Sequence, residues 1–366
     1  DPEMIGIVCG GVAECTALMK QKLDFVLYTG GGPVGKIIMS ACSKQLTPCA
    51  LELGGKNPVI IDDDCDLDTS LKRILMGRFD SNAGQICVSP EYIFLSASKQ
   101  KEAIQIIRKH LLQFYGSDGN TEDAESYFNI VNSRHFQRIE KLRNYYLQSK
   151  PDQIAIGGAN DKQFGPDKVN PKTRHLPPMV LCDVDFNNDK IMEDEVFGPI
   201  LSIIPMRGSF AEWKEDALKY IRSKDKPLAC YIFSRNPSSP SIQSLKNRIA
   251  AGTICINEVV MFMILKDLPF GGVGESGMGS YNGVYSFRLF SQQKAVAICS
   301  HGREALLKSR YPKPGKVSAE EAAKQRRSLE AMFEKPTSRL TQIAKYSAAV
   351  GVIVGAVYYY KKYMRS

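Results

Sequence analysis

Two residues of this chain, Cys87 and Glu52, carry side chains that are suited to covalent catalysis. The Cys87 thiol follows a Gly-Gln pair and can attack a carbonyl carbon, while the Glu52 carboxylate precedes Gly54 and Gly55 and can take up a proton. The two residues stand 35 positions apart, so only the tertiary structure can bring them together. We therefore predict a thiol nucleophile, Cys87, served by a general base, Glu52.

Each of these residues has an alternative interpretation. The other nine cysteines are scattered singly, and a buried, unreactive thiol would fit most of them. Glu52 follows Gly30 by 22 residues, near the spacing of the acid that binds a ribose in dinucleotide-binding folds. That acid stands at the end of a strand, whereas we expect Glu52 on a glycine-rich turn. We therefore keep Glu52 as the base.

A glycine-rich loop, Gly30–Lys36, lies between a strand-like and a helix-like segment. Gly30, Gly32 and Gly35 fit the pattern G-x-G-x-x-G, and the loop also fits the start of a P-loop. Both patterns place backbone N–H groups at a helix N-terminus beside a phosphate. The P-loop interpretation fails at Ile37, where a Ser or Thr should bind Mg²⁺. We predict a phosphate-binding loop, and an ordinary tight turn is the alternative.

Segments of strand and helix character alternate around these sites, which predicts an α/β fold. The expected strands are 23–29, 59–61, 200–205, 229–233 and 253–256. The expected helices are 34–43, 68–79, 101–115, 135–147 and 241–248.

The composition excludes several classes of protein. Ten cysteines occur without a C-x-x-C pair and with only four histidines, so we expect neither a disulfide framework nor a metal site. The formal net charge of +9 lies entirely in residues 301–366, because acidic and basic side chains balance in the other 300 residues. No nucleic-acid-binding motif accompanies this charge, so we expect no nucleic-acid partner. A basic stretch beside an apolar segment indicates anionic lipid instead.

Five segments, in order along the chain, make the sequence similar to the aldehyde dehydrogenase superfamily. These segments are Tyr28–Gly35, Leu51–Lys56, Gly84–Cys87, Glu195–Pro199 and Pro269–Gly279. Three further strings resemble its class 3 branch, which oxidises fatty aldehydes. They are Leu46-Thr47-Pro48, Asp64–Asp68 and Arg310-Tyr311-Pro312.

The resemblance implies a mechanism and a set of site residues. In that superfamily the thiolate attacks an aldehyde, a hydride passes to NAD or NADP, and the glutamate activates the water that hydrolyses the thioester. These catalytic roles would fall to Cys87 and Glu52, and a substrate contact to Phe270. The implied cofactor-binding residues are Gly30, Gly31, Gly32, Gly35, Leu53, Glu195 and Phe197.

The sequence departs from the superfamily pattern in two places. Gly31 and Gly32 stand where the superfamily has a serine and a threonine, so we expect looser phosphate binding. The loop before Cys87, residues 80–83, is one residue longer than usual, which could shift the direction of the thiol.

The resemblance also implies four regions and a truncated N-terminus. Residues 1–51 would be the remnant of a Rossmann-type NAD(P)-binding domain, 52–290 the catalytic domain, and 291–341 a bridging segment and basic linker. We expect most of the nucleotide-binding domain, roughly 150 residues, to be missing before Asp1. A sheet that lacks strands exposes an edge and apolar faces, so we expect the chain by itself to aggregate.

The last region, 342–363, has the features of a short C-terminal transmembrane helix. Between Lys345 and Lys361 lie 15 uncharged residues, about 22 Å of helix against a hydrocarbon core of about 30 Å. The two lysines would extend this reach by snorkelling. An ordinary buried helix is the alternative.

Together these expectations give one main hypothesis. The chain would be a membrane-anchored homodimer with a cytosolic catalytic domain, which oxidises long-chain fatty aldehydes with NAD or NADP. The mitochondrial outer membrane is favoured, and the endoplasmic reticulum, peroxisome and lipid droplet stay open. The alternative hypothesis is a catalytically inactive, truncated remnant of such an enzyme.

Overall fold

The computed structural model describes residues 3–298, 318–321, 323–324 and 326–327. The chain divides into two compact units, Asp1–Gln293 and Lys294–Ser366. In the described part of the second unit, the Ser318 hydroxyl accepts a hydrogen bond of 3.2 Å from the Glu321 amide. The anchor predicted at 342–363 lies outside the described residues. Among the residues that are described, no helix is long and apolar enough to cross a bilayer.

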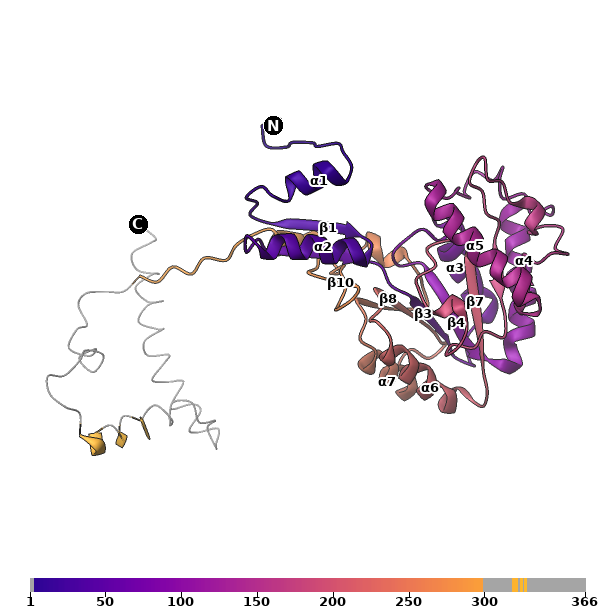
Figure 1. Ribbon diagram of the computed structural model, residues 1–366. Coiled ribbons are helices and arrows are strands. Elements are labelled where there is room, and N and C mark those ends of the chain that lie inside the picture. The colour runs from indigo at the N-terminus through magenta and orange to yellow at the C-terminus, as the bar shows by residue number, and fades with distance from the viewer. Residues whose placement is uncertain (1–2, 299–317, 322, 325, 328–366) are drawn as a thin grey trace, which may run out of the picture. The chain divides into compact units, whose positions relative to one another are not determined.

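A seven-stranded sheet forms the centre of the first unit (Figure 1). Its strand order is β5-β6-β7-β4-β3-β8-β9, and every pairing is parallel except that of β5 with β6. The strands are β3 (Asn57–Ile61), β4 (Pro90–Ser96), β5 (Ile154–Ile156), β6 (Met179–Leu181), β7 (Ile200–Met206), β8 (Ala229–Phe233) and β9 (Thr253–Ile256).

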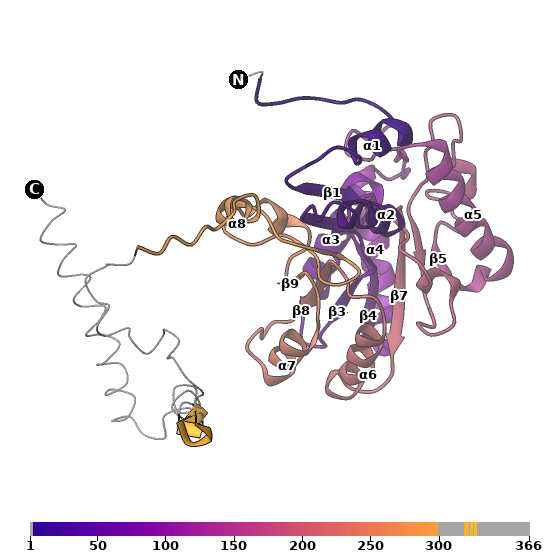
Figure 2. The same cartoon turned by 60° about the vertical axis from the view of Figure 1, so that its left-hand side comes forward.

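Helices cover both faces of this sheet, so its central strands are buried and most of their residues are apolar. Successive side chains point to opposite faces: Val59 and Ile61 join the core that contains α3 and α4, whereas Ile60 joins the core that contains α5, α6 and α7. Figures 1 and 2 show α6 and α7 side by side. The helices are α3 (Leu67–Leu75), α4 (Gln100–Tyr115), α5 (Ser133–Ser149), α6 (Phe210–Ser223) and α7 (Pro240–Arg248).

A second sheet has three strands in the order β1-β2-β10. β1 is parallel to β2, and β10 is antiparallel to β2. Helix α2 connects β1 to β2 and packs against both strands (Figure 2). The elements are α1 (Val12–Leu18), β1 (Val26–Gly30), α2 (Gly32–Ser43), β2 (Cys49–Leu53), β10 (Gly277–Met278) and α8 (Gly283–Leu289).

The expected elements are present, with shifts at their ends. The predicted helix 68–79 ends as α3 at Leu75 and continues as a π-helical turn, Met76–Asp80. Its N-terminus is capped by Asp66, whose carboxylate accepts a hydrogen bond of 3.0 Å from the Thr69 amide. Strands β2, β4, β5, β6 and β10 were not predicted. A proline or an acidic residue interrupts the apolar pattern of β2 and β4, and the other three strands have only two or three residues.

Candidate active site

Cys87 lies in an irregular segment between α3 and β4, after the turn Asn82–Gly84. In this turn Ala83 and Gly84 have positive φ angles of 50° and 76°. The side-chain amide of Asn57 donates hydrogen bonds of 2.9 Å to the Cys87 carbonyl and 3.0 Å to the Ser89 carbonyl, so it holds the chain on the far side of the thiol. The backbone around the predicted nucleophile is thus fixed on both sides.

Gln85 is a buried residue of this segment whose role the sequence did not reveal. Its side-chain amide donates to the carbonyls of Asn82 at 3.1 Å and Asn129 at 3.2 Å. Its side-chain oxygen accepts a hydrogen bond of 3.0 Å from the Val131 amide. Gln85 therefore fastens the loop of Cys87 to the segment that precedes α5. The Gly-Gln pair was the available signal, but its partners are 44 and 46 residues away.

Glu52 lies in strand β2, and its prediction on a glycine-rich turn was wrong. The strand pairs on both sides, so Thr29 of β1 and Gly277 of β10 are its neighbours in register. This pairing carries the strand through Leu53, and the turn begins only at Gly54. Glu52 is consequently 3% exposed, and burial raises the pKa of its carboxyl group.

The side chains of Cys87 and Glu52 come together. Their interaction lowers the pKa of Glu52, against the effect of burial, and contributes to raising the pKa of Cys87. Burial is the main cause that raises the Cys87 pKa, so the thiol is neutral at pH 7 until a base removes its proton. Oε1 of Glu52 has no hydrogen-bond partner among the described residues, so it is available to accept that proton or one from water.

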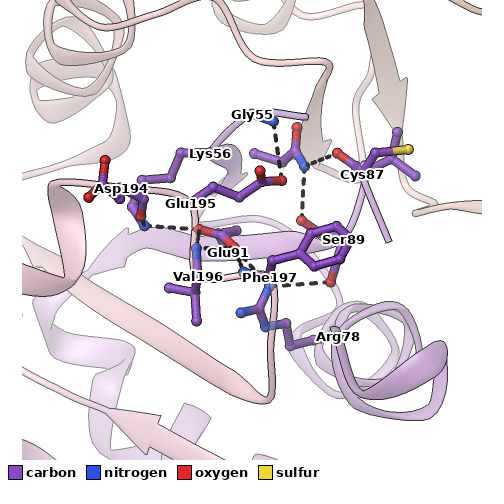
Figure 3. Close-up of polar contacts among 12 residues, drawn as sticks. Gly55, Lys56, Arg78, Cys87, Ser89, Glu91, Asp194, Glu195, Val196 and Phe197 are labelled. Atoms are coloured by element: carbon purple, nitrogen blue, oxygen red, sulfur yellow. Dashed lines mark hydrogen bonds and ion pairs between the residues drawn. The ribbon is translucent and has the colours of Figure 1, made fainter. Parts of the chain in front are cut away.

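Glu195 lies beside the Gly54-Gly55 turn that follows β2 (Figure 3). Its carboxylate accepts a hydrogen bond of 3.2 Å from the Gly55 amide. A Cβ atom on Gly54 would come within 2.5 Å of the same carboxylate, so any larger residue there would displace the Glu195 side chain. Burial and the nearby Glu91 carboxylate raise the pKa of Glu195 to about 7. Phe197 follows with a φ of 46°, which is uncommon outside glycine.

A cleft of about 370 Å³ opens at this place. It brings together three of the predicted cofactor-binding residues, Gly32, Leu53 and Glu195. Gly35 does not line the cleft but allows α2 to pack on β2. A Cβ atom at this position would come within 2.8 Å of the Leu53 side chain. The predicted contacts Gly30 and Gly31 do not line the cleft.

The residues of the cleft fit a dinucleotide. Gly32 opens helix α2, whose first amides can bind a phosphate. Glu195 presents a carboxylate that can accept a hydrogen bond from a ribose hydroxyl. The Gly31 amide, which we predicted to bind the cofactor, already lies against the Tyr28 hydroxyl.

Phe270 is buried in the apolar core against which Cys87 packs, and its backbone is paired with that of Tyr281. The two backbones exchange hydrogen bonds of 2.9 Å, and the ring centroids are 5.5 Å apart. Burial raises the pKa of Tyr281 to about 12, and its electrostatic interactions with Glu52 and Cys87 add to the effect, so the phenol lies near both. The sequence did not single out Tyr281, which stands two residues after the segment Pro269–Gly279 and in none of the five motifs.

Comparison with known proteins places this geometry in a family. A family model described as "Aldehyde dehydrogenase family" matches residues 1–296. The chain is 42% identical over 312 residues to Aldehyde dehydrogenase family 3 member A2 of Mus musculus. The matched stretch covers 85% of this chain and 59% of that protein. It is 39% identical over 312 residues to "Aldehyde dehydrogenase, dimeric NADP-preferring" of Canis lupus familiaris, with 85% and 63% covered. The chain thus spans less than two thirds of the length of either relative.

Solved structures show the same fold. The substrate-bound state of Staphylococcus aureus AldH superposes with a TM-score of 0.69 at 34% identity, covering 82% of this chain and 63% of that one. Mycobacterium tuberculosis aldehyde dehydrogenase complexed with NAD⁺ gives a TM-score of 0.65 at 27% identity, covering 78% and 55%. The predicted α/β fold is confirmed, as is the resemblance to the class 3 branch. This chain belongs to the aldehyde dehydrogenase family.

Proposed function

We propose that this chain carries the active site of an enzyme that oxidises aldehydes to carboxylic acids with NAD or NADP. The proposal depends on one observation, the contact between the Cys87 thiol and the Glu52 carboxylate beside a cleft lined by Glu195. A structural cysteine needs no buried carboxylate with a raised pKa against it, whereas a nucleophile that must lose its proton does.

The reaction would use Glu52 twice. Glu52 first takes the proton of Cys87, and the sulfur then bonds to the carbonyl carbon of the aldehyde. NAD or NADP, when bound in the cleft, supplies the acceptor for the hydride that leaves this carbon. The product on the chain is a thioester at Cys87. After releasing its first proton, Glu52 removes a proton from the water that attacks the thioester, and the acid leaves as the thiol is restored.

The cofactor would be held mainly by Gly32, Leu53 and Glu195, the predicted residues that line the cleft. Phe197 lies on the same segment as Glu195. Gly30 and Gly31 would shape the turn before α2, and Gly35 within α2 would let this helix pack on β2. We leave the choice between NAD and NADP open, because relatives of both kinds are similar to this chain.

An apolar aldehyde suits the surroundings of Cys87. The thiol packs against the same apolar core as Met76, Ile86, Val260 and Met263. A hydrocarbon chain placed there would replace contact with water by contact with these side chains. Together with the resemblance to the class 3 branch, this supports long-chain fatty aldehydes as the substrate class.

The test is reduction of NAD or NADP by a long-chain aldehyde, with Cys87→Ser compared with Cys182→Ser. Both variants remove a thiol whose pKa is raised by burial, but Cys182 lies at the end of β6. We expect Cys87→Ser to lose roughly 10³-fold or more in rate and Cys182→Ser to keep the rate. Equal rates for the two variants would reject the nucleophile assignment.

The same assay decides the alternative of an inactive remnant. It should be run on residues 1–366 and on any longer product whose upstream coding sequence joins this chain in frame. Folded protein that binds the cofactor but forms no product with any aldehyde would support the inactive alternative.

We further propose that residues 342–363 anchor the enzyme in the mitochondrial outer membrane with the catalytic domain in the cytosol, and that it forms a homodimer. The support is the uncharged segment between Lys345 and Lys361, and a relative named as dimeric. Alkaline extraction of membranes should leave the chain in the pellet and release a chain that ends before residue 342. Release of both chains would contradict the anchor.

A further inference from the structure

The buried carboxylate of Glu91 accepts hydrogen bonds from the backbone of the segment that contains Glu195. Glu91 stands in β4 and is 2% exposed. Its two oxygens accept hydrogen bonds from the Val196 amide at 2.9 and 3.0 Å, and one of them accepts a third bond from the Phe197 amide at 3.1 Å (Figure 3). One carboxylate thus binds two consecutive amides of a segment that is 105 residues away in sequence.

Two cations keep Glu91 ionised. Lys56 Nζ lies 2.9 Å from Oε2, and Arg78 Nη1 lies 3.2 Å from Oε1. Burial raises the pKa of Glu91, but the two cations and the Val196 amide outweigh this effect, and the pKa is lowered. The carboxylate is therefore a charged acceptor, and its hydrogen bonds are stronger than those of a neutral one.

Glu91 also belongs to the segment that carries the nucleophile. Arg78 lies in the π-helical turn before Cys87, and Glu91 follows Cys87 by four residues, so the ion pair closes the loop that holds the thiol. The loop and the Glu195 segment touch directly, because a Cβ atom on Gly84 would come within 2.5 Å of the Gly198 carbonyl oxygen.

The backbone that Glu91 holds is in an unfavourable conformation. Phe197 has a φ of 46°, and such a conformation persists only where the surroundings fix it. On the carbonyl side, Arg138 of α5 donates a hydrogen bond of 2.6 Å to the Val196 oxygen. Glu91 supplies the opposite restraint at the amides.

We propose that Glu91 is a positioning residue that holds the Glu195–Phe197 segment in register with the loop of Cys87. Neither the sequence motifs nor the family resemblance singled it out. The inference rests on the proposed function insofar as Glu195 and Phe197 contact NAD or NADP. It predicts that loss of the Glu91 carboxylate weakens cofactor binding beyond any loss of stability.

The competing explanation is that the ion pairs of Glu91 only stabilise the fold, and Asp189 offers a matched control. Asp189 is also buried and paired with a lysine, Lys150. It accepts hydrogen bonds from the Asp185 amide at 2.7 Å and the Gln153 side chain at 3.0 Å, outside the cleft. Glu91→Gln and Asp189→Asn should both lower the melting temperature.

NADH binding, followed by fluorescence, separates the two explanations. We expect the Kd to rise about tenfold in Glu91→Gln, because a charged acceptor of two amides is lost, and to stay within about twofold in Asp189→Asn. Equal affinities in the two variants would overturn the inference.

The pH dependence of NADH binding is a second test, because two variants should shift the pKa of Glu195 in opposite directions. The charged and titratable groups that face Glu195 are Glu91, Lys56, Arg78, Arg138 and the Cys87 thiol. Glu91→Gln removes a negative charge, so the pKa of Glu195 should fall and the binding midpoint should move to lower pH. Lys56→Gln removes a positive charge and should move the midpoint to higher pH. Because Lys56 is partly exposed, this variant keeps the test available where Glu91→Gln does not fold.

A measurement without cofactor separates failure of this inference from failure of the proposed function. Absence of NADH binding in the unaltered protein would count against the function alone. Alkylation of Cys87 by iodoacetamide should still be severalfold faster in Glu91→Gln than in Asp189→Asn, because release of the loop exposes a half-buried thiol. Equal alkylation rates would contradict the positioning role.

Discussion

Both sheets of the first unit consist of strands with neighbouring helices, but they differ in how completely their residues are buried. In the seven-stranded sheet every residue of β3, β4 and β8 is buried, between helices on both faces. In the three-stranded sheet the residues of β1 are alternately half-buried and exposed, and α1 has no buried residue. The sheet that presents Cys87 thus has a complete core, whereas the sheet that presents Glu52 has little.

The thin cover leaves apolar side chains in water. Val12 of α1 is 85% exposed, Ile37 of α2 is 66% exposed, and Leu46 after α2 is 90% exposed. Side chains of this size are usually covered when they cluster on one part of a surface. The difference teaches that Cys87 and Glu52 come from two sheets of unequal support, so the position of Glu52 depends on β2 being held from both sides.

The largest effect should come from Glu52→Gln, which acts where the two sheets meet. Loss of the base should lower kcat by roughly 10²- to 10⁴-fold. In the unaltered enzyme the raised pKa of Glu52 should place the acid limb of the rate profile above the ordinary glutamate range. A full rate in the variant would remove Glu52 from the mechanism.

The same variant should be more stable at neutral pH. The folded chain keeps the Glu52 proton at pH values where the unfolded chain has released it, because burial raises the pKa in the fold. The free energy of unfolding therefore falls as pH rises between the two pKa values, and glutamine removes this loss. Denaturant titration at several pH values measures the difference, and a less stable variant at neutral pH would contradict it.

The second prediction tests whether the two sheets differ in how completely their side chains are buried. Phe94 of β4 is fully buried and packs against the rings of Tyr92, Phe186 and Tyr220. Phe94→Ala should lower the free energy of unfolding by about 3–5 kcal/mol. Ile37→Ala on α2 should change it by no more than about 0.5 kcal/mol. Similar losses in a denaturant titration would mean that α2 is covered in solution.

The smallest effect in free energy should come from Ile37→Lys. Its stability should stay within about 0.5 kcal/mol of the unaltered chain, because the side chain is exposed. The variant should nevertheless aggregate less, since a charge would interrupt the apolar surface of α2. Light scattering of the two proteins at equal concentration measures this. No change would mean that another surface drives association.

Much of the seven-stranded sheet could be predicted from the sequence. Ala229–Phe233 has the bounds that its apolar run predicted, because a strand buried on both faces has no polar residue to blur its ends. Thr253–Ile256, a half-buried strand at the edge of the sheet, also has its predicted bounds. Strand β4 was missed because it begins with Pro90 and Glu91. Glu91 can stand there only because Lys56 and Arg78 neutralise it, and local sequence does not show such partners.

The sequence by itself determined the family and the α/β alternation, and it predicted the two reactive groups, because these depend on residue types in short motifs. The tertiary structure alone decided that Glu52 lies within a paired strand, that Tyr281 lies near Glu52 and Cys87, and that Glu91 accepts hydrogen bonds from the Glu195 segment. Each of these depends on contacts between residues tens to hundreds of positions apart. Their cause is the desolvation of charged and polar groups, which must find partners wherever the fold places them.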